Sequence, residues 1–222
     1  MRTHTDGDGI LRETALTIDE RTTNAPASAP AASGRLVVVS GPSGTGKSTL
    51  VRRVVEQCAP GVVLSISATS RAPRVGEVDG VDYLFLSRED FEQAIARGEF
   101  LEWAEVHGNL YGTPAGPVAQ AVARGCRVLL EIDVQGGMQV RSRVPDAFLI
   151  FVHAPSFEVL EARLRARGTD GEATILRRLA NARAELEQSP RYDVQLVNDD
   201  LDRAVAELAD VLGRLSPGSG GS

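Results

Sequence analysis

The chain has 222 residues, enough for one α/β domain with a substantial core or for two small domains. Its formal charge is −6, from 24 lysines and arginines against 30 aspartates and glutamates. Because nucleic-acid binding requires a basic footprint, this balance argues against a nucleic-acid partner, and any polyanionic ligand must be held by local clusters of arginine and lysine.

Both ends of the chain are poor in residues that build a core. Residues 1–33 end in a run of small residues and proline, TTNAPASAPAAS, so we expect a disordered tail there. Residues 216–222, SPGSGGS, predict a second flexible tail. The sequence contains neither an apolar run of membrane-spanning length nor a secretory signal pattern. We therefore expect a cytoplasmic protein without a membrane partner, whose folded domain covers residues 34–215.

Short β-branched runs alternate with helical patterns between the tails. The predicted strands are 36–40, 62–67, 126–133, 148–152 and 194–197. The predicted helices are 47–58, 88–97, 114–124, 136–143, 156–166, 172–187 and 201–215. This alternation predicts an α/β fold with a parallel sheet covered by helices on both faces, and with ligands at the carboxyl ends of the strands. Residues 68–113 break the pattern and predict a mixed, strand-rich insertion.

The loop after the first predicted strand has the pattern G-x-x-x-x-G-K-[ST] and precedes a predicted helix. It comprises Gly41, Pro42, Ser43, Gly44, Thr45, Gly46, Lys47, Ser48 and Thr49. Glycines allow backbone amides to surround an anion, and the start of the helix adds partial positive charge. We expect Lys47 to reach the β and γ phosphates of ATP and Ser48 to bind Mg²⁺. Taken alone, the loop predicts only the binding of a nucleoside triphosphate.

A second loop, SISATSRAPRVGE at 65–77, places Arg71 and Arg74 three residues apart, and guanidinium groups match phosphate oxygens well. Further motifs follow in the order GVDY, EFLEWA, GNLYGT, EID-VQG, RGT and VNDD. Together with the phosphate loop, this set resembles the guanylate kinase family, and the resemblance covers about residues 35–213. It is specific as a set, because unrelated phosphate-loop proteins share only the first motif.

The resemblance implies a phosphate-loop nucleotide-kinase fold with a parallel core sheet, a small mixed GMP-binding insertion at about 68–113 and a helical lid at about 163–178. It implies transfer of the terminal phosphate of ATP to GMP, and also to dGMP, with Mg²⁺ as cofactor, in purine metabolism. The implied GMP-binding residues are Ser67, Arg71, Arg74, Tyr83, Glu102, Tyr111, Thr113, Glu131 and Asp133. The implied ATP-binding residues are those of the phosphate loop and Asn198. The implied catalytic residues are Lys47, Arg71, Arg163, Arg167 and Arg178.

The chemistry of guanine agrees with an acid at position 102. Guanine presents two donors, N1–H and N2–H₂, and a carboxylate accepts from both, whereas adenine presents an acceptor at N1. The O6 atom of guanine needs a donor, which the Ser67 or Thr113 hydroxyl can supply. The family often has aspartate where this chain has Glu131, so direct contact with the base and contact through water both stay open.

The VNDD motif and the arginines on either side of RGT allow more than one interpretation. The side-chain amide of Asn198 can bind adenine, while Asp199 or Asp200 can cap the final helix. Arg165 and Arg177 are interpreted as parts of an ion-paired helix face with Glu158, Glu161 and Glu172, rather than as lid residues.

Three other functions remain as alternatives. The DVQG segment at 133–136 resembles the D-x-x-G of a GTPase switch, although no N-K-x-D motif occurs in the sequence. Guanylate kinase-like domains also occur as non-catalytic interaction modules, usually with damaged phosphate loops. A kinase acting on another nucleoside monophosphate is the third alternative. The sequence leaves open a monomer or a small homo-oligomer.

Overall fold

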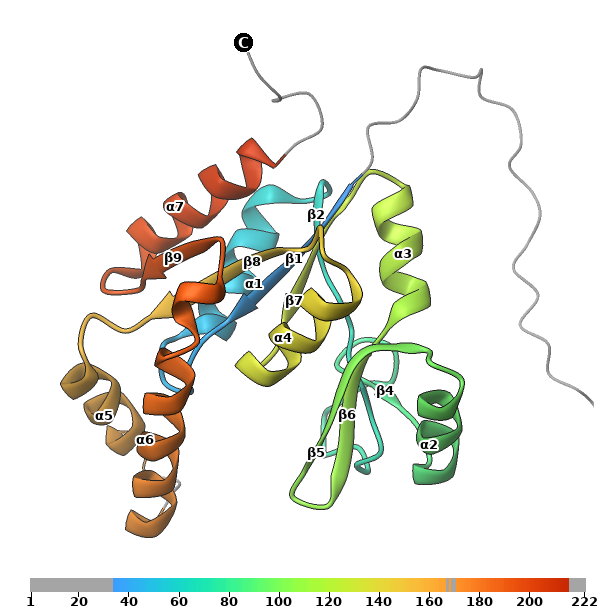
Figure 1. The fold of residues 1–222 in the computed structure, drawn as a ribbon, viewed down its shortest axis with the longest axis horizontal. Coiled ribbons are helices and arrows are strands. Elements are labelled where there is room, and N and C mark those ends of the chain that lie inside the picture. The colour runs from blue at the N-terminus through green and yellow to red at the C-terminus, as the bar shows by residue number, and fades with distance from the viewer. Residues whose placement is uncertain (1–33, 167, 169–170, 216–222) are drawn as a thin grey trace, which may run out of the picture. The chain divides into compact units, whose positions relative to one another are not determined.

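A parallel sheet of five strands, in the order β2-β7-β1-β8-β9, forms the centre of the structure (Figure 1). The structure is a computed structural model that describes residues 34–166, 168 and 171–215. The strands are β1 (Arg35–Ser40), β2 (Val62–Leu64), β7 (Arg127–Glu131), β8 (Phe148–His153) and β9 (Val194–Val197). In the centre of the sheet, Val38 of β1 pairs with Leu130 on one side and Leu149 on the other. The two predicted tails lie outside the described residues.

Successive residues of β1 point to opposite faces of this sheet, and both faces are buried. Val37 and Val39 pack against α1 (Lys47–Cys58) and α7 (Leu201–Arg214). Leu36 and Val38 join the core formed with α3 (Ala115–Ala123) and α4 (Val134–Arg143). A strand with helices on both sides needs apolar residues at every position, which explains the continuous apolar run. The predicted α/β architecture is confirmed.

A second, smaller sheet forms the predicted insertion, with strand order β4-β3-β6-β5 (Figure 1). Its strands are β3 (Ala68–Thr69), β4 (Leu84–Phe85), β5 (Phe100–Val106) and β6 (Asn109–Pro114). The sheet is mixed, because β3 runs parallel to β4 and antiparallel to β6. Helix α2 (Arg88–Ala96) covers it, and the Phe91 ring stacks on the Phe100 ring at a centroid distance of 4.3 Å.

The remaining helices follow β8. Helices α5 (Phe157–Ala166) and α6 (Glu172–Leu186) pack on each other through Leu160, Leu164 and Ile175. A 3₁₀ turn (Ser189–Arg191) leads on to β9. No helix in the described part of the chain is both long and apolar enough to cross a bilayer.

Several predicted boundaries differ from the observed ones by one to three residues, and the structure gives a reason for two of them. Strand β2 ends at Leu64 rather than residue 67; after Ser65 donates its N–H to Leu129, the chain enters the insertion. Helix α4 begins at Val134 rather than Gly136, because the Asp133 carboxylate accepts from the Gly136 N–H at 2.7 Å and caps the helix.

Candidate active site

The phosphate loop links the end of β1 to the start of α1, and glycine is required at two of its positions. Gly41 has φ 143° and Gly46 has φ 86°, a region that side chains rarely allow. A Cβ atom at Gly41 would lie 2.3 Å from the Val152 carbonyl oxygen, and one at Gly46 would lie 2.5 Å from Nδ2 of Asn198. The resulting loop encloses a small cavity of about 170 Å³, lined by Ser43, Gly44, Gly46, Lys47, Ser48 and Thr49.

Lys47 and Ser48 are the first residues of α1, and their side chains point to different partners. The Lys47 ammonium donates to the carbonyl oxygens of Gly41 and Pro42, the second at 2.8 Å. The Ser48 hydroxyl donates to the Glu131 carboxylate at the end of β7. The positive charge of Lys47 thus lies on the loop carbonyls, whereas Ser48 and Glu131 share one hydrogen bond.

A second cavity, of about 340 Å³, adjoins the phosphate loop, and Asn198 and Arg163 are among the residues that line it. Nδ2 of Asn198 donates to the Thr45 carbonyl oxygen at 2.7 Å. The Arg163 guanidinium donates to the Asn198 carbonyl oxygen at 3.0 Å. Asn198, expected to bind ATP, and Arg163, expected to be catalytic, therefore lie at the phosphate loop, and the buried Asn198 amide supports the loop backbone.

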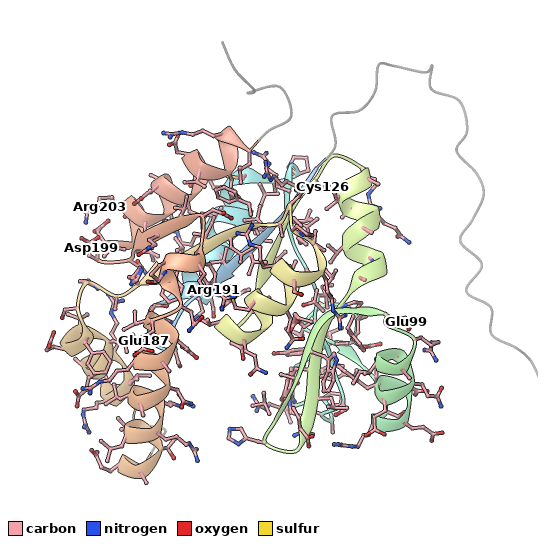
Figure 2. The ribbon with its side chains drawn as sticks, viewed as in Figure 1. Glu99, Cys126, Glu187, Arg191, Asp199 and Arg203 are labelled. Atoms are coloured by element: carbon pink, nitrogen blue, oxygen red, sulfur yellow. The ribbon has the colours of Figure 1, made fainter. Side chains whose placement is uncertain are left out.

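The two aspartates after Asn198 have separate roles. The Asp200 carboxylate accepts from the Arg203 N–H at 2.9 Å, so this residue is the N-cap of α7. Asp199 forms an ion pair with the side chain of Arg203, which lies in the first turn of the helix; both residues are labelled in Figure 2. Of the two predicted capping residues, Asp200 is the cap.

The expected lid arginines are only partly described. Arg178 lies half-buried on α6, and Arg167 lies outside the described residues. Arg165 donates to Glu161 at 2.8 Å and to Glu172 at 2.6 Å, which confirms its interpretation as an ion-paired residue of the helix face.

Arg71, Tyr83 and Tyr111 lie together on the insertion. The Arg71 guanidinium carbon is 5.6 Å from the centroid of the Tyr83 ring, and the two tyrosine rings are 6.2 Å apart, edge to face. Arg71 also donates to Glu77 at 2.8 Å. This hydrogen bond, with a further one to Tyr111, raises the pKa of Arg71, so its positive charge is secure.

Glu77 is a site residue whose role the sequence did not predict. One carboxylate oxygen accepts from Arg71, and the other accepts from the backbone N–H of Arg74 at 2.7 Å. The hydrogen bond from Arg71 is the main cause that lowers the pKa of Glu77. This single acid thus fixes the loop that carries both arginines. The sequence offered one indication of this role, since Glu77 is the only acidic residue of the 65–77 segment.

Glu102 on β5 is a buried acid with a defined environment. Its Oε1 atom accepts from the Thr113 hydroxyl on β6 at 2.6 Å. Its Oε2 atom faces the first turn of α4, where a Cβ atom on Gly136 would come within 2.9 Å. Burial raises the pKa of Glu102, the Thr113 hydrogen bond opposes this effect, and the charge of Asp133 adds to it. The carboxylate is therefore oriented from two sides without a cation bonded to it in the described residues.

Three further predicted residues surround this acid or the loop. Asp133 follows β7, caps α4 and also accepts from the Ser40 hydroxyl through its backbone carbonyl at 3.2 Å. Glu131 contacts Ser48, as described above, so its carboxylate lies on the phosphate-loop side. Ser67 lies half-buried immediately before β3, with its carbonyl oxygen accepting from Leu84 at 2.9 Å.

The largest described cavity among these, about 790 Å³, lies between α4 and α6. Asp133, Gln139 and Glu185 are among its lining residues. Burial raises the pKa of Glu185, and the positive charge of Lys47 opposes this effect. No local pattern in the sequence distinguishes Glu185 from the other acids of its helix, so the sequence did not predict its place in the cleft.

Comparisons with known proteins agree over nearly the whole described region. The family model described as guanylate kinase matches residues 33–215. A guanylate kinase of Rubrobacter xylanophilus is 51% identical over 185 residues, which cover 83% of this chain and 96% of the relative. One of Gloeobacter violaceus is 52% identical over 192 residues, covering 86% and 92%. The crystal structure of guanylate kinase from Anaplasma phagocytophilum is 32% identical, has a TM-score of 0.66, and covers 83% of this chain and 87% of that one.

Proposed function

This chain belongs to the guanylate kinase family, and we propose that it transfers the terminal phosphoryl group of ATP to GMP, giving ADP and GDP. The observation that carries the assignment of the base is the buried pair of Glu102 and Thr113. An intact phosphate loop, together with the arginine cluster of the insertion, supports phosphoryl transfer between two nucleotides. We infer a catalytic domain of residues 34–215, with its GMP-binding insertion at about 68–113 and a lid at about 163–178.

Glu102 supplies the acceptors that a guanine edge requires. Its carboxylate accepts from N1–H and N2–H₂ of guanine, while adenine would place the lone pair of N1 against it. A site built on such polar pairing rejects the wrong base strongly, because the buried groups would be left unpaired.

The Thr113 hydroxyl has one hydrogen, and that hydrogen is used on Glu102. We infer that Thr113 offers a lone pair to the guanine amino group, so that the donor to O6 comes from Ser67. The sequence left Ser67 and Thr113 as alternative donors to O6, and this assignment gives that role to Ser67 alone. Glu131 lies on the phosphate-loop side, which supports an indirect role toward the base.

Arg71, Arg74, Tyr83 and Tyr111 bind the acceptor phosphate in this proposal. The ion pair between Arg71 and Glu77 orients the guanidinium before the nucleotide arrives, at a site where both side chains are mostly shielded. A phosphate monoester is already a strong anion near neutral pH, so the nucleophile needs no general base. Catalysis then depends on alignment and on neutralising charge.

The donor side uses the phosphate loop. The backbone amides and Lys47 hold the β and γ phosphates, and Arg163 and Arg178 add positive charge from α5 and α6. Ser48 and Glu131 fit a magnesium ion, because a hydroxyl and a carboxylate oxygen already lie within one hydrogen bond of each other and Mg²⁺ prefers such hard oxygen ligands. When bound there, Mg²⁺ would neutralise phosphate charge. The cytoplasmic location expected from the sequence stays a prediction.

An acceptor screen tests the proposal directly. ADP formation from ATP with magnesium is measured with GMP, dGMP, AMP, dTMP and UMP as acceptors. We expect turnover with GMP and dGMP and very little with the other three. ATP consumption that no acceptor stimulates would overturn the proposal and favour a binding module or a switch. Preference for a pyrimidine or adenine acceptor would overturn the role of Glu102.

A further inference from the structure

One face of α4 holds the outer strand of the insertion. Gly136, Gln139 and Arg143 are spaced by three and four residues, so they lie on the same side of the helix. Strand β5 is the last strand of its sheet and, among the described residues, pairs only with β6, so its other edge has no strand partner there. Such an edge presents backbone groups that need hydrogen-bond partners.

The side chains of α4 supply those partners. The Trp103 N–H donates to Oε1 of Gln139 at 3.2 Å, and Nε2 of Gln139 donates to the Trp103 carbonyl oxygen at 3.1 Å. Arg143 donates to the carbonyl oxygen of Phe100 on the same strand. A single carboxamide therefore satisfies both backbone groups of one residue, which resembles the pairing that a neighbouring strand would give.

The residue fixed in this way is adjacent to Glu102. One turn before Gln139, Gly136 approaches the Glu102 carboxylate so closely that a Cβ atom there would lie 2.9 Å from Oε2. The position of Glu102 relative to α4 thus depends on where β5 lies along the helix. The two hydrogen bonds between Gln139 and Trp103 fix the position of β5 along the helix at the residue next to Glu102.

We propose that Gln139 is a positioning residue for guanine selection. Its carboxamide holds the Trp103 backbone against α4, and this keeps the Glu102 carboxylate aligned between Thr113 and the first turn of the helix. The role rests on the proposed function, because it concerns the acid that reads the base. Gln139 is suited to it since the site needs one donor and one acceptor at the same reach, which neither glutamate nor methionine provides.

Inosine monophosphate is the probe that separates positioning from general stability. It has the N1–H and O6 of guanine but lacks the 2-amino group, so it loses part of the contact with Glu102. If the carboxylate moves, GMP loses more than inosine monophosphate does, and the ratio of their kcat/KM values falls. A variant that only unfolds more easily lowers both values by the same factor.

The experiment compares Gln139→Met and Gln139→Glu with the full-length wild-type chain, using kcat, KM and Tm. Methionine has a similar length but makes neither hydrogen bond, whereas glutamate keeps the acceptor for the Trp103 N–H. We expect Gln139→Met to lower the GMP preference about tenfold, mainly through the KM for GMP, with the KM for ATP unchanged. Gln139→Glu should lower the GMP preference less, and it provides the test if Gln139→Met does not fold.

Gln93→Met is the matched control, because Gln93 lies on α2 of the same insertion and its side chain bonds only weakly, at 3.4 Å, to Glu89. It should leave the GMP preference unchanged. If folded Gln139 variants keep the wild-type preference while Glu102→Gln loses it, the positioning role is wrong and the proposed function stands. If the wild-type chain does not phosphorylate GMP, the proposed function itself fails, and the role of Gln139 fails with it.

Discussion

Thr113 on β6 donates its hydroxyl hydrogen to Oε1 of Glu102 on β5, at 2.6 Å, where both side chains are buried. The two residues are paired in the antiparallel register of β5 and β6. Because a strand pair fixes the separation of opposite side chains, the acid is held in place before a ligand binds. Preorganisation of this kind lowers the cost of ordering the site when the nucleotide arrives.

Thr113→Val tests the value of that hydrogen bond. Valine has nearly the shape of threonine but cannot donate, so the buried carboxylate loses a partner and its pKa rises further. A hydrogen bond to a charged group contributes about 1.5–3 kcal/mol, so the KM for GMP should rise between about tenfold and a hundredfold. Thr113→Ser keeps the donor and should restore most of the affinity. Equal KM values in steady-state assays of the three proteins would contradict this account.

Glu102→Gln should reduce the discrimination between GMP and AMP. The substituted amide presents a donor on one side, which clashes with guanine N1–H and tolerates adenine N1. Competition assays with both monophosphates measure the ratio of their kcat/KM values. Unchanged discrimination in a folded variant would remove Glu102 from base recognition.

The same substitution should change how stability depends on pH. The pKa of Glu102 lies above its ordinary value of 4.5, mainly because of burial. The folded chain therefore keeps this proton to a higher pH than the unfolded chain, and the free energy of unfolding falls as the pH rises from about 4.5 through the folded pKa. Glu102→Gln has no proton to lose, so its stability should fall less over that window. Denaturant unfolding at a series of pH values checks the sign, and a variant that loses more stability than wild type would contradict it.

Gly136→Ala should weaken GMP binding without unfolding the protein. The added Cβ atom would lie 2.9 Å from Oε2 of Glu102 and 3.3 Å from Oδ1 of Asp133. Alanine is favoured over glycine inside a helix by up to about 1 kcal/mol, which offsets the contact, while the displaced carboxylate no longer fits the base. We expect the KM for GMP to rise about tenfold with Tm nearly unchanged. Gly116→Ala on α3 is the control, since its Cβ atom would meet nothing within 4 Å.

The elements of the core could be predicted because their patterns are local. Helix α1 has the predicted bounds, and the alternation of apolar residues in β1 reflects helices on both faces. The phosphate loop could be predicted for the same reason, since its spacing is contiguous in the sequence. The resemblance to a family, rather than periodicity, gave the distant residues Glu102 and Thr113.

Contacts between elements could not be predicted in this way. The bonds from Gln139 to Trp103 join residues 36 positions apart, and neither residue type signals the other. The sequence shows Glu77 in the arginine loop but does not show what it contacts, because only the folded loop brings its two oxygens to Arg71 and Arg74. Side-chain roles that depend on tertiary contact leave no periodic trace in one sequence.

Glu77→Gln tests the orientation of the acceptor arginines. Two effects compete, because removing a negative charge near the phosphate favours anion binding, while losing charged hydrogen bonds frees the loop. The loss should dominate, because Glu77 holds both the Arg71 side chain and the Arg74 backbone, whereas removing one negative charge adds little attraction for the phosphate. We expect a KM for GMP raised about tenfold and a smaller change in kcat. Glu92→Gln is the control, since its ion pair with Arg88 is exposed on α2, and a lower KM in Glu77→Gln would show that charge outweighs orientation.

Lys47→Ala separates catalysis from acceptor binding. The Lys47 ammonium bonds to the carbonyl oxygens of Gly41 and Pro42 in the phosphate loop, whereas Arg71 lies against Tyr83 on the insertion. In the proposed mechanism the charge of Lys47 acts on the phosphoryl group in transit, and loss of one such group typically lowers turnover by about 10²–10³. GMP affinity, measured by calorimetry without ATP, should stay unchanged, because the acceptor site has its own cations. Arg52→Ala, an exposed residue of the same helix, should leave both quantities unchanged. If GMP affinity fell as much as kcat did in Lys47→Ala, the two phosphate sites would not be separate, and the division of roles proposed for this cleft would be wrong.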